Sequence, residues 1–162
     1  MTHPNLLRGK RIIVVDDEND ILETIAQLLD MCEIVMARSF EEARELLEKE
    51  RFDIAILDIM GVDGFSLLNI ATKKNVIPVM LTANALKPEY IVKSYNEGAA
   101  SFLPKEKMEE IAVFLNDVLE ARQKGKDPWW RWAWRLASYW RKEFGKDWEH
   151  QDQEFWQKLK KL

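Results

Sequence analysis

Within residues 1–120, short apolar runs alternate with longer segments whose apolar residues recur at helical spacing. Three of the runs are apolar without alternation, which is typical of strands buried on both faces of a parallel sheet. Each parallel strand needs a crossover, and both faces of such a sheet need helices to cover them. The pattern therefore predicts an α/β fold with a doubly wound, five-stranded parallel sheet. The expected elements are strands at 11–16, 33–37, 53–58, 77–82 and 100–103 and helices at 19–30, 40–50, 64–74, 88–97 and 106–122.

Several of the expected helices carry end signals. Ser39 and Glu42 have the spacing of a capping box, in which a hydroxyl and a carboxylate satisfy free backbone amides. Pro88 suits the first turn of a helix, and Gly98 suits the residue after a last turn. These signals support the predicted helix boundaries.

The composition changes near residue 121. Residues 1–120 carry 13 Lys and Arg against 22 Asp and Glu, whereas residues 121–162 carry 11 against 6. All seven tryptophans lie in the second part, and the segment 123–128 contains glycine and proline, which favour a break between elements. We therefore predict a domain at 1–122 and a tryptophan-rich helical tail at 123–162.

The sequence contains no segment that resembles a membrane anchor. No window approaches the roughly 18 to 20 uninterrupted apolar residues of a spanning helix, and residues 1–10 lack the apolar core of a signal peptide. We expect the chain in the cytoplasm.

Polar residues follow the expected strands at their carboxyl ends, where ligands collect in doubly wound sheets. The first strand ends in Asp16 and Asp17, the third in Asp58 and the fourth in Thr82, and Lys105 follows the fifth. Three carboxylates gathered at one place repel one another unless a cation lies among them, and oxygen ligands favour Mg²⁺. The sequence predicts a magnesium site at this edge.

A carboxylate beside Mg²⁺ can attack a phosphoryl group while positive groups neutralise the other phosphoryl oxygens. Asp58 lies at the end of the third strand and is the predicted nucleophile, with Asp16 and Asp17 available for the cation. Thr82 would donate a hydrogen bond to the phosphoryl group, and Lys105 would supply a charge. Taken singly, each acid could merely cap a helix or begin a loop. The joint pattern favours a phosphoacceptor site.

These segments resemble the receiver domain of two-component response regulators over residues 9–122. The matching segments are Ile12–Glu18, Ile56–Met60, Val79–Ala83 and Gly98–Lys105. The resemblance implies a (βα)5 flavodoxin-like fold of the CheY-like superfamily. It also implies that a sensor histidine kinase or phosphotransfer protein phosphorylates Asp58, with Mg²⁺ held by Asp17, Asp58 and the backbone carbonyl of Met60, assisted by Asp16.

The same resemblance implies a switch. Thr82 would move toward the phosphoryl group and Phe102 would turn inward, which changes the face made by the fourth helix, fifth strand and fifth helix. The alternative for Phe102 is an ordinary core aromatic. Such a protein is a phosphoacceptor in a phosphorelay rather than an enzyme, with at most self-catalysed, Mg-dependent phosphotransfer and autodephosphorylation.

Two positions depart from the family pattern. The loop 59–64 is shorter than usual and lacks the family's proline, which puts the metal geometry and kinase docking there in question. Glu106 replaces a proline that commonly forms a cis peptide with the preceding lysine. A cis bond before a residue other than proline costs roughly 2.5 to 4 kcal/mol, so we expect a trans bond.

The tail predicts a helical hairpin. Over 128–144, apolar residues line one side of a predicted helix, and three further residues widen this stripe. Asp147 could begin a second helix. So much aromatic surface needs a partner. Three hypotheses remain open, namely that the tail packs on its own receiver, that it forms a homodimer or binds another protein, and that it lies on a membrane surface. We expect no nucleic acid, because the tail is too short for a complete DNA-binding domain. The stripe consists of Trp129, Trp132, Ala133, Leu136, Trp140 and Phe144, with Trp130, Trp134 and Ala137 beside it.

Two other functional classes compete with the main hypothesis. A phosphatase of the haloacid dehalogenase type would place a second aspartate two residues after the nucleophile, a position that Met60 occupies. A receiver that no longer accepts phosphate would serve only as a binding module. The sequence does not identify the kinase, the stimulus or the lifetime of the phosphate.

Overall fold

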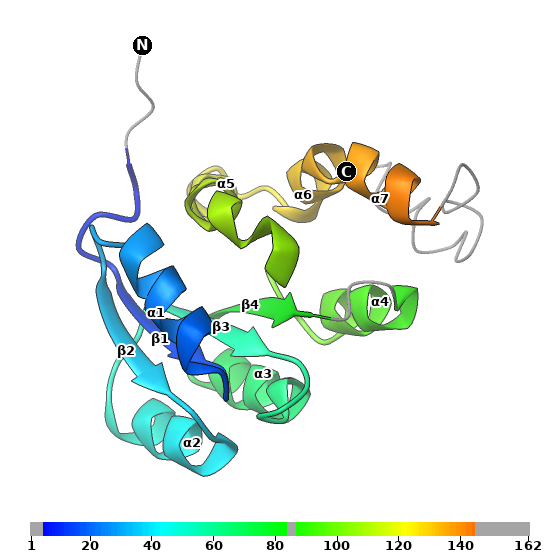
Figure 1. The fold of residues 1–162 in the computed structure, drawn as a ribbon. Helices are drawn as coiled ribbons and strands as arrows, with labels where there is room; N and C mark the ends of the chain where they lie inside the picture. The colour runs from blue at the N-terminus through cyan, green and yellow to red at the C-terminus, as the bar shows by residue number, and fades with distance from the viewer. Residues whose placement is uncertain (1–4, 84–86, 145–162) are drawn as a thin grey trace.

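The computed structural model describes residues 5–83 and 87–144, and strands and helices alternate in the part up to residue 123 (Figure 1). The strands are β1 (Arg11–Val15), β2 (Glu33–Ala37), β3 (Ile54–Asp58), β4 (Ile77–Thr82) and β5 (Ser101–Pro104). The helices between and after them are α1 (Asn19–Leu28), α2 (Phe40–Lys49), α3 (Gly64–Lys73), α4 (Pro88–Asn96), the 3-10 helix η1 (Lys105–Glu110) and α5 (Ile111–Gln123).

The five strands form one parallel sheet in the order β2-β1-β3-β4-β5. Every residue of β3, β4 and β5 is buried, whereas β2 at one edge is only partly covered. Helices α1 and α5 contact each other on one face, and α2 and α3 contact each other on the other (Figure 1). The predicted doubly wound α/β fold is confirmed.

The predicted helix ends are also present. The hydroxyl of Ser39 accepts a hydrogen bond from the amide of Glu42 at 3.2 Å, which satisfies one free donor of α2. Pro88 is the first residue of α4, where its missing N–H has no consequence. Gly98 follows α4 with φ +100°, a conformation that side chains disfavour.

Most predicted boundaries agree with the structure within two residues, and the main difference lies after β5. Strand β5 begins at Ser101 and ends at Pro104, one residue later than expected. Lys105 and the first five residues of the predicted helix 106–122 form the 3-10 helix η1. The bond between Lys105 and Glu106 is trans, as expected, and none of the described peptide bonds is cis.

The described part of the tail consists of α6 (Trp129–Arg135) and α7 (Ala137–Phe144), which meet at Leu136 instead of forming one continuous helix. In Figure 1 both helices lie above α4, with α6 on the side of α5, and α6 contacts α5 and β5. Trp129 and Trp132 are buried in the receiver's own core. The inclusion of Trp134 in the apolar stripe was wrong, because that side chain is 73% exposed.

The second tail helix, predicted to begin near Asp147, lies outside the described residues. In the ranges 5–83 and 87–144, every helix is too short or too polar to cross a lipid bilayer.

Candidate functional site

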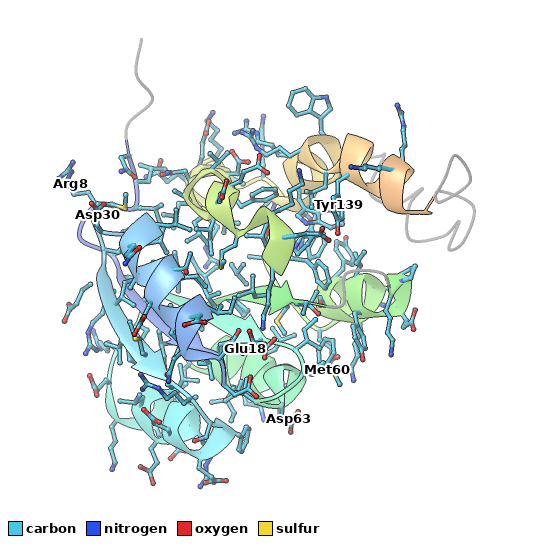
Figure 2. The ribbon with its side chains drawn as sticks, viewed as in Figure 1. Arg8, Glu18, Asp30, Met60, Asp63 and Tyr139 are labelled. Carbon is cyan, nitrogen blue, oxygen red and sulfur yellow. The ribbon has the colours of Figure 1, made fainter. Side chains whose placement is uncertain are left out.

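The strand register places the predicted site residues at one edge of the sheet. Val15 pairs with Leu57, so Asp16 and Asp58 follow as neighbours at the ends of β1 and β3. Asp58 itself pairs with Leu81, so Thr82 lies one position further along β4. The loops that extend from these strands gather at the same edge, where Figure 2 labels Glu18, Met60 and Asp63.

Lys105 lies among the acids. Its ammonium nitrogen is 2.9 Å from Oδ2 of Asp16, 3.4 Å from Oδ1 of Asp58 and 3.6 Å from Oε1 of Glu18. Asp16 and Asp58 are almost fully buried, whereas Glu18 is exposed. The register explains this approach, because Thr82 pairs with Pro104 and Lys105 comes next in the chain.

Burial dominates the electrostatics of this cluster. The pKa of Asp58 is raised to about 6, mainly by loss of solvent and next by the charge of Asp16, while Lys105 acts in the opposite direction. Burial likewise raises the pKa of Asp16 despite its bond to Lys105. Burial alone would lower the pKa of Lys105, but the carboxylates of Asp16, Asp58 and Glu18 outweigh it and raise that pKa. The site therefore holds more negative charge than one lysine neutralises.

The two predicted switch residues lie on the neighbouring strands. Thr82 is the last residue of β4 and is buried. Phe102 lies in β5 and is fully buried, and its main chain is only three residues from Lys105. The buried state of Phe102 satisfies both hypotheses for this residue, as a switch and as a core aromatic.

The shortened loop after Asp58 approaches the acidic pair closely. Gly61 adopts φ +44°, and a Cβ atom at this position would lie 2.7 Å from Oδ1 of Asp17. A Cβ on Gly64 would lie 2.2 Å from the carbonyl oxygen of Asp58. The carbonyl of Met60, a predicted metal ligand, accepts a hydrogen bond from the amide of Val62 in this tight turn. Glycines at 61 and 64 thus allow a short loop to pass beside the carboxylates.

The acidic residues are suited to a divalent cation. Oxygen atoms of Asp16, Asp17 and Glu18 lie within 4.8 Å of one another, and Asp58 is the next carboxylate across the sheet. Magnesium favours such hard oxygen ligands and commonly keeps several waters, so an exposed group such as Asp17 suits it. The residues present fit a magnesium ion.

Two residues of this edge were not predicted to have a role. Glu18 contacts Lys105, and its position directly after two acids was a signal that could have identified it. The close approach of Gly61 to Asp17 had only a weak signal, a glycine in a shortened loop, because the contact depends on how two loops meet.

A family model and curated relatives agree on the kind of protein that this chain resembles. The family model described as the response regulator receiver domain matches residues 12–116. The two-component response regulator ARR12 of Arabidopsis thaliana is 30% identical over 121 residues, which cover 70% of this chain and 20% of that protein. The heme response regulator HssR of Staphylococcus aureus strain Newman is 49% identical over 76 residues, which cover 44% of this chain and 34% of that protein. The chain thus spans about a fifth to a third of the length of these curated relatives.

Solved structures show the same fold. A CheY-like response regulator receiver domain protein from Methanospirillum hungatei JF-1 has a TM-score of 0.65 and 30% identity, over 72% of this chain and 98% of that chain. The receiver domain of Francisella response regulator 1452 has a TM-score of 0.63 and 23% identity, over 70% and 99% of the two chains. The chain therefore belongs to the response regulator receiver domain family, which has a phosphoacceptor role in two-component signalling.

Proposed function

We propose that Asp58 is the phosphoacceptor and that a sensor histidine kinase or phosphotransfer protein donates the phosphoryl group. The observation that carries this proposal is the position of the Asp58 carboxylate, at the carboxyl end of a central strand and 3.4 Å from the ammonium of Lys105. A carboxylate nucleophile at the end of one strand and an ammonium group directly after another suit the transfer of a phosphoryl group.

The transfer forms one bond and breaks one. A carboxylate oxygen of Asp58 attacks phosphorus as the phosphorus–nitrogen bond of the donor histidine breaks, and the bonding electron pair stays with the imidazole nitrogen. Lys105 then pairs with a phosphoryl oxygen, and the hydroxyl of Thr82 donates a hydrogen bond to another. Thr82 ends β4, which is adjacent to the strand of Asp58, and Lys105 follows β5, the next strand across the sheet, which supports these roles.

Asp16, Asp17, Asp58 and the carbonyl of Met60 would hold a magnesium ion. When bound, the ion neutralises the excess negative charge of the carboxylates and of the phosphoryl oxygens. Asp16 and Asp17 add their negative charges to the effect of burial in raising the pKa of Asp58, which supports the need for such a cation. Glu18 would stay outside this ligand set and act through Lys105.

The chain would act as an acceptor rather than a turnover enzyme. Its own chemistry would extend at most to Mg-dependent self-phosphorylation from a small donor and to hydrolysis of the aspartyl phosphate. The match to the receiver family supports this reading over a phosphatase. The phosphorylated protein would signal through protein contacts made by a receiver at 1–122 and a tail at 123–162. The cytoplasmic location stays a prediction.

The test is incubation with Mg²⁺ and acetyl phosphate, followed by mass spectrometry of the intact protein. We expect one added phosphoryl group in the parent and none in Asp58→Asn. Asp53→Asn is the matched control, because Asp53 precedes the same strand at the opposite edge of the sheet and bonds to the amide of Arg11. An unmodified parent protein would contradict the proposal and favour a receiver that only binds partners. Equal modification of Asp58→Asn would also contradict it, because another residue would then be the acceptor.

A further inference from the structure

Helix α6 lies against the face made by α4, β5 and α5, and α7 contacts η1, which follows β5. The indole N–H of Trp129 donates a hydrogen bond to the carbonyl of Ala99 at 2.7 Å, and the indole N–H of Trp132 donates to the carbonyl of Phe102. The ring of Trp129 also meets the ring of Tyr95 in α4 edge-on, with centroids 5.3 Å apart. Both indoles are buried, so this face is covered by the chain's own tail.

Charged groups fix the same helix to α5. Asp117 is a buried acid of α5, and Arg131 and Arg135 of α6 both pair with it. The distances are 3.2 Å from Arg131 Nη1 and 3.0 Å from Arg135 Nη2 to Asp117 Oδ1. Arg131 also reaches Glu120 at 3.0 Å. These pairs set the position of α6 along α5.

The tail contacts the chain on both sides of Lys105. Trp132 bonds to the backbone of Phe102, three residues before the lysine. The phenol of Tyr139 in α7 donates a hydrogen bond to the carboxylate of Glu106, the residue directly after it. The ammonium of Lys107 lies 5.7 Å from the centre of the Tyr139 ring. The segment that carries Lys105 to Asp58 is therefore held by the tail at two points.

Glu106 is one of the two positions at which this chain departs from the family pattern. A proline side chain there could not accept a hydrogen bond from Tyr139, whereas the carboxylate of Glu106 does. The residue that departs from the family pattern is thus the one that bonds to the tail.

We propose that α6 and α7 hold the Phe102–Glu106 segment in the arrangement in which Lys105 pairs with Asp16, so that docking of the tail and phosphorylation of Asp58 oppose each other. This inference rests on the proposed function above. A phosphoryl group on Asp58 attracts Lys105 away from Asp16, where it now lies at 2.9 Å. Since the two tail contacts flank Lys105 closely, a shift of the lysine strains them.

The coupling must act in both directions. If phosphorylation weakens docking by some factor, docking weakens the affinity of Asp58 for a phosphoryl mimic by the same factor. Undocking would also expose the aromatic side of α6 and the α4–β5–α5 face together, which would give the receiver two surfaces for protein contact.

The first measurement uses hydrogen exchange of the full chain with and without Mg²⁺ and beryllofluoride, a mimic of the phosphoryl group. We expect the mimic to raise the exchange rates of the amides of α6 and α7 by about 5-fold or more, a typical size for coupling between sites. The amides of α2 serve as an internal reference, since α2 packs elsewhere, beside α3.

The second measurement is the affinity of tail variants for beryllofluoride in the presence of Mg²⁺. Tyr139→Phe and Glu106→Ala each remove the same hydrogen bond, so each should bind the mimic about 3- to 10-fold more tightly, and the double variant no more tightly than either one. Trp132→Phe should act in the same direction. Trp134→Phe is the matched control, because Trp134 is exposed on the same helix.

The outcomes separate the two proposals. Beryllofluoride that binds the parent without changing exchange in α6 and α7, together with unchanged affinity in Tyr139→Phe and Glu106→Ala, would overturn the coupling and leave Asp58 as the phosphoacceptor. Failure of the mimic to bind the parent or any variant would overturn the proposed function and the coupling with it.

Discussion

The ammonium nitrogen of Lys105 lies closer to Asp16, at 2.9 Å, than to Asp58, at 3.4 Å. In this arrangement the lysine neutralises the fully buried acid first and leaves Asp58 with a pKa raised to about 6. The carboxylate proposed to accept the phosphoryl group is therefore the less compensated of the two.

Replacing Lys105 by methionine should destabilise the protein at pH 7. The change leaves two buried carboxylates without their cation, and breaking such a pair costs about 3 to 5 kcal/mol. The pKa of Lys105 is raised, so its contribution is complete below its unfolded value and is lost only as pH rises through the folded value. Urea unfolding at pH 7 measures the loss, with exposed Lys49→Met as the control. Equal stability of the two variants would contradict the role of the ion pair.

Asp58→Asn should stabilise the metal-free protein above pH 6. The pKa of Asp58 is raised on folding, mainly by burial, so its ionisation opposes folding. The penalty is absent below about pH 4, grows as pH rises between the unfolded and folded values, and is complete above the folded value. We expect a gain on the order of 1 to 3 kcal/mol at pH 8 and none at pH 3.5.

Magnesium should reverse the order of stability of the parent and Asp58→Asn. Added Mg²⁺ stabilises only the protein that binds it, so thermal unfolding of the parent should shift upward while Asp58→Asn shifts little. A parent that gains no more than the variant would argue against a metal site that includes Asp58.

Gly61→Ala should weaken magnesium binding as well as stability. The new Cβ would lie 2.7 Å from Oδ1 of Asp17, at a backbone φ of +44°. Gly9→Ala is a matched control, because Gly9 has φ +80° with nothing within 4 Å of the added atom. Backbone strain alone costs about 1 to 2 kcal/mol in both variants. Titration calorimetry with Mg²⁺ should show a lower affinity only for Gly61→Ala, and equal affinities would refute the close approach.

Asp117→Asn should loosen the tail. The substitution removes the charge that Arg131 and Arg135 share, and it should weaken docking by about 1 to 2 kcal/mol. Trypsin cleavage after Lys124 or Lys126, in the segment that connects α5 to α6, should then become faster than in the parent. The difference should shrink at high salt, which screens the ion pairs of the parent. Asp30→Asn is the control, since Asp30 is exposed and lies far from Tyr139 in Figure 2.

Much of the fold could be predicted because its signals are local. The unbroken apolar runs of β1, β3 and β4 depend on residues a few positions apart, as do the capping box at Ser39 and the turn at Gly98. The same apolar runs also showed which acidic residues stand at the carboxyl ends of strands. The division of the chain at residue 122 stays a prediction.

The tail shows where local signals end. Trp132 and Trp134 are the same residue type two positions apart, yet one is buried in the core and the other is 73% exposed. Helical periodicity identifies a stripe but cannot fix its width, because the receiver's surface decides how much of the helix is covered. The predicted stripe was therefore too wide.

The sequence by itself determined the alternation of strands and helices, the acids at the strand ends and the family. Only the tertiary structure decided that Lys105 pairs first with Asp16, that Gly61 lies against Asp17 and that Tyr139 bonds to Glu106. The physical reason is the range of the interactions. Helix and strand preferences arise between near neighbours in the chain, whereas these three contacts join residues between 33 and 89 positions apart and depend on the path of the whole backbone.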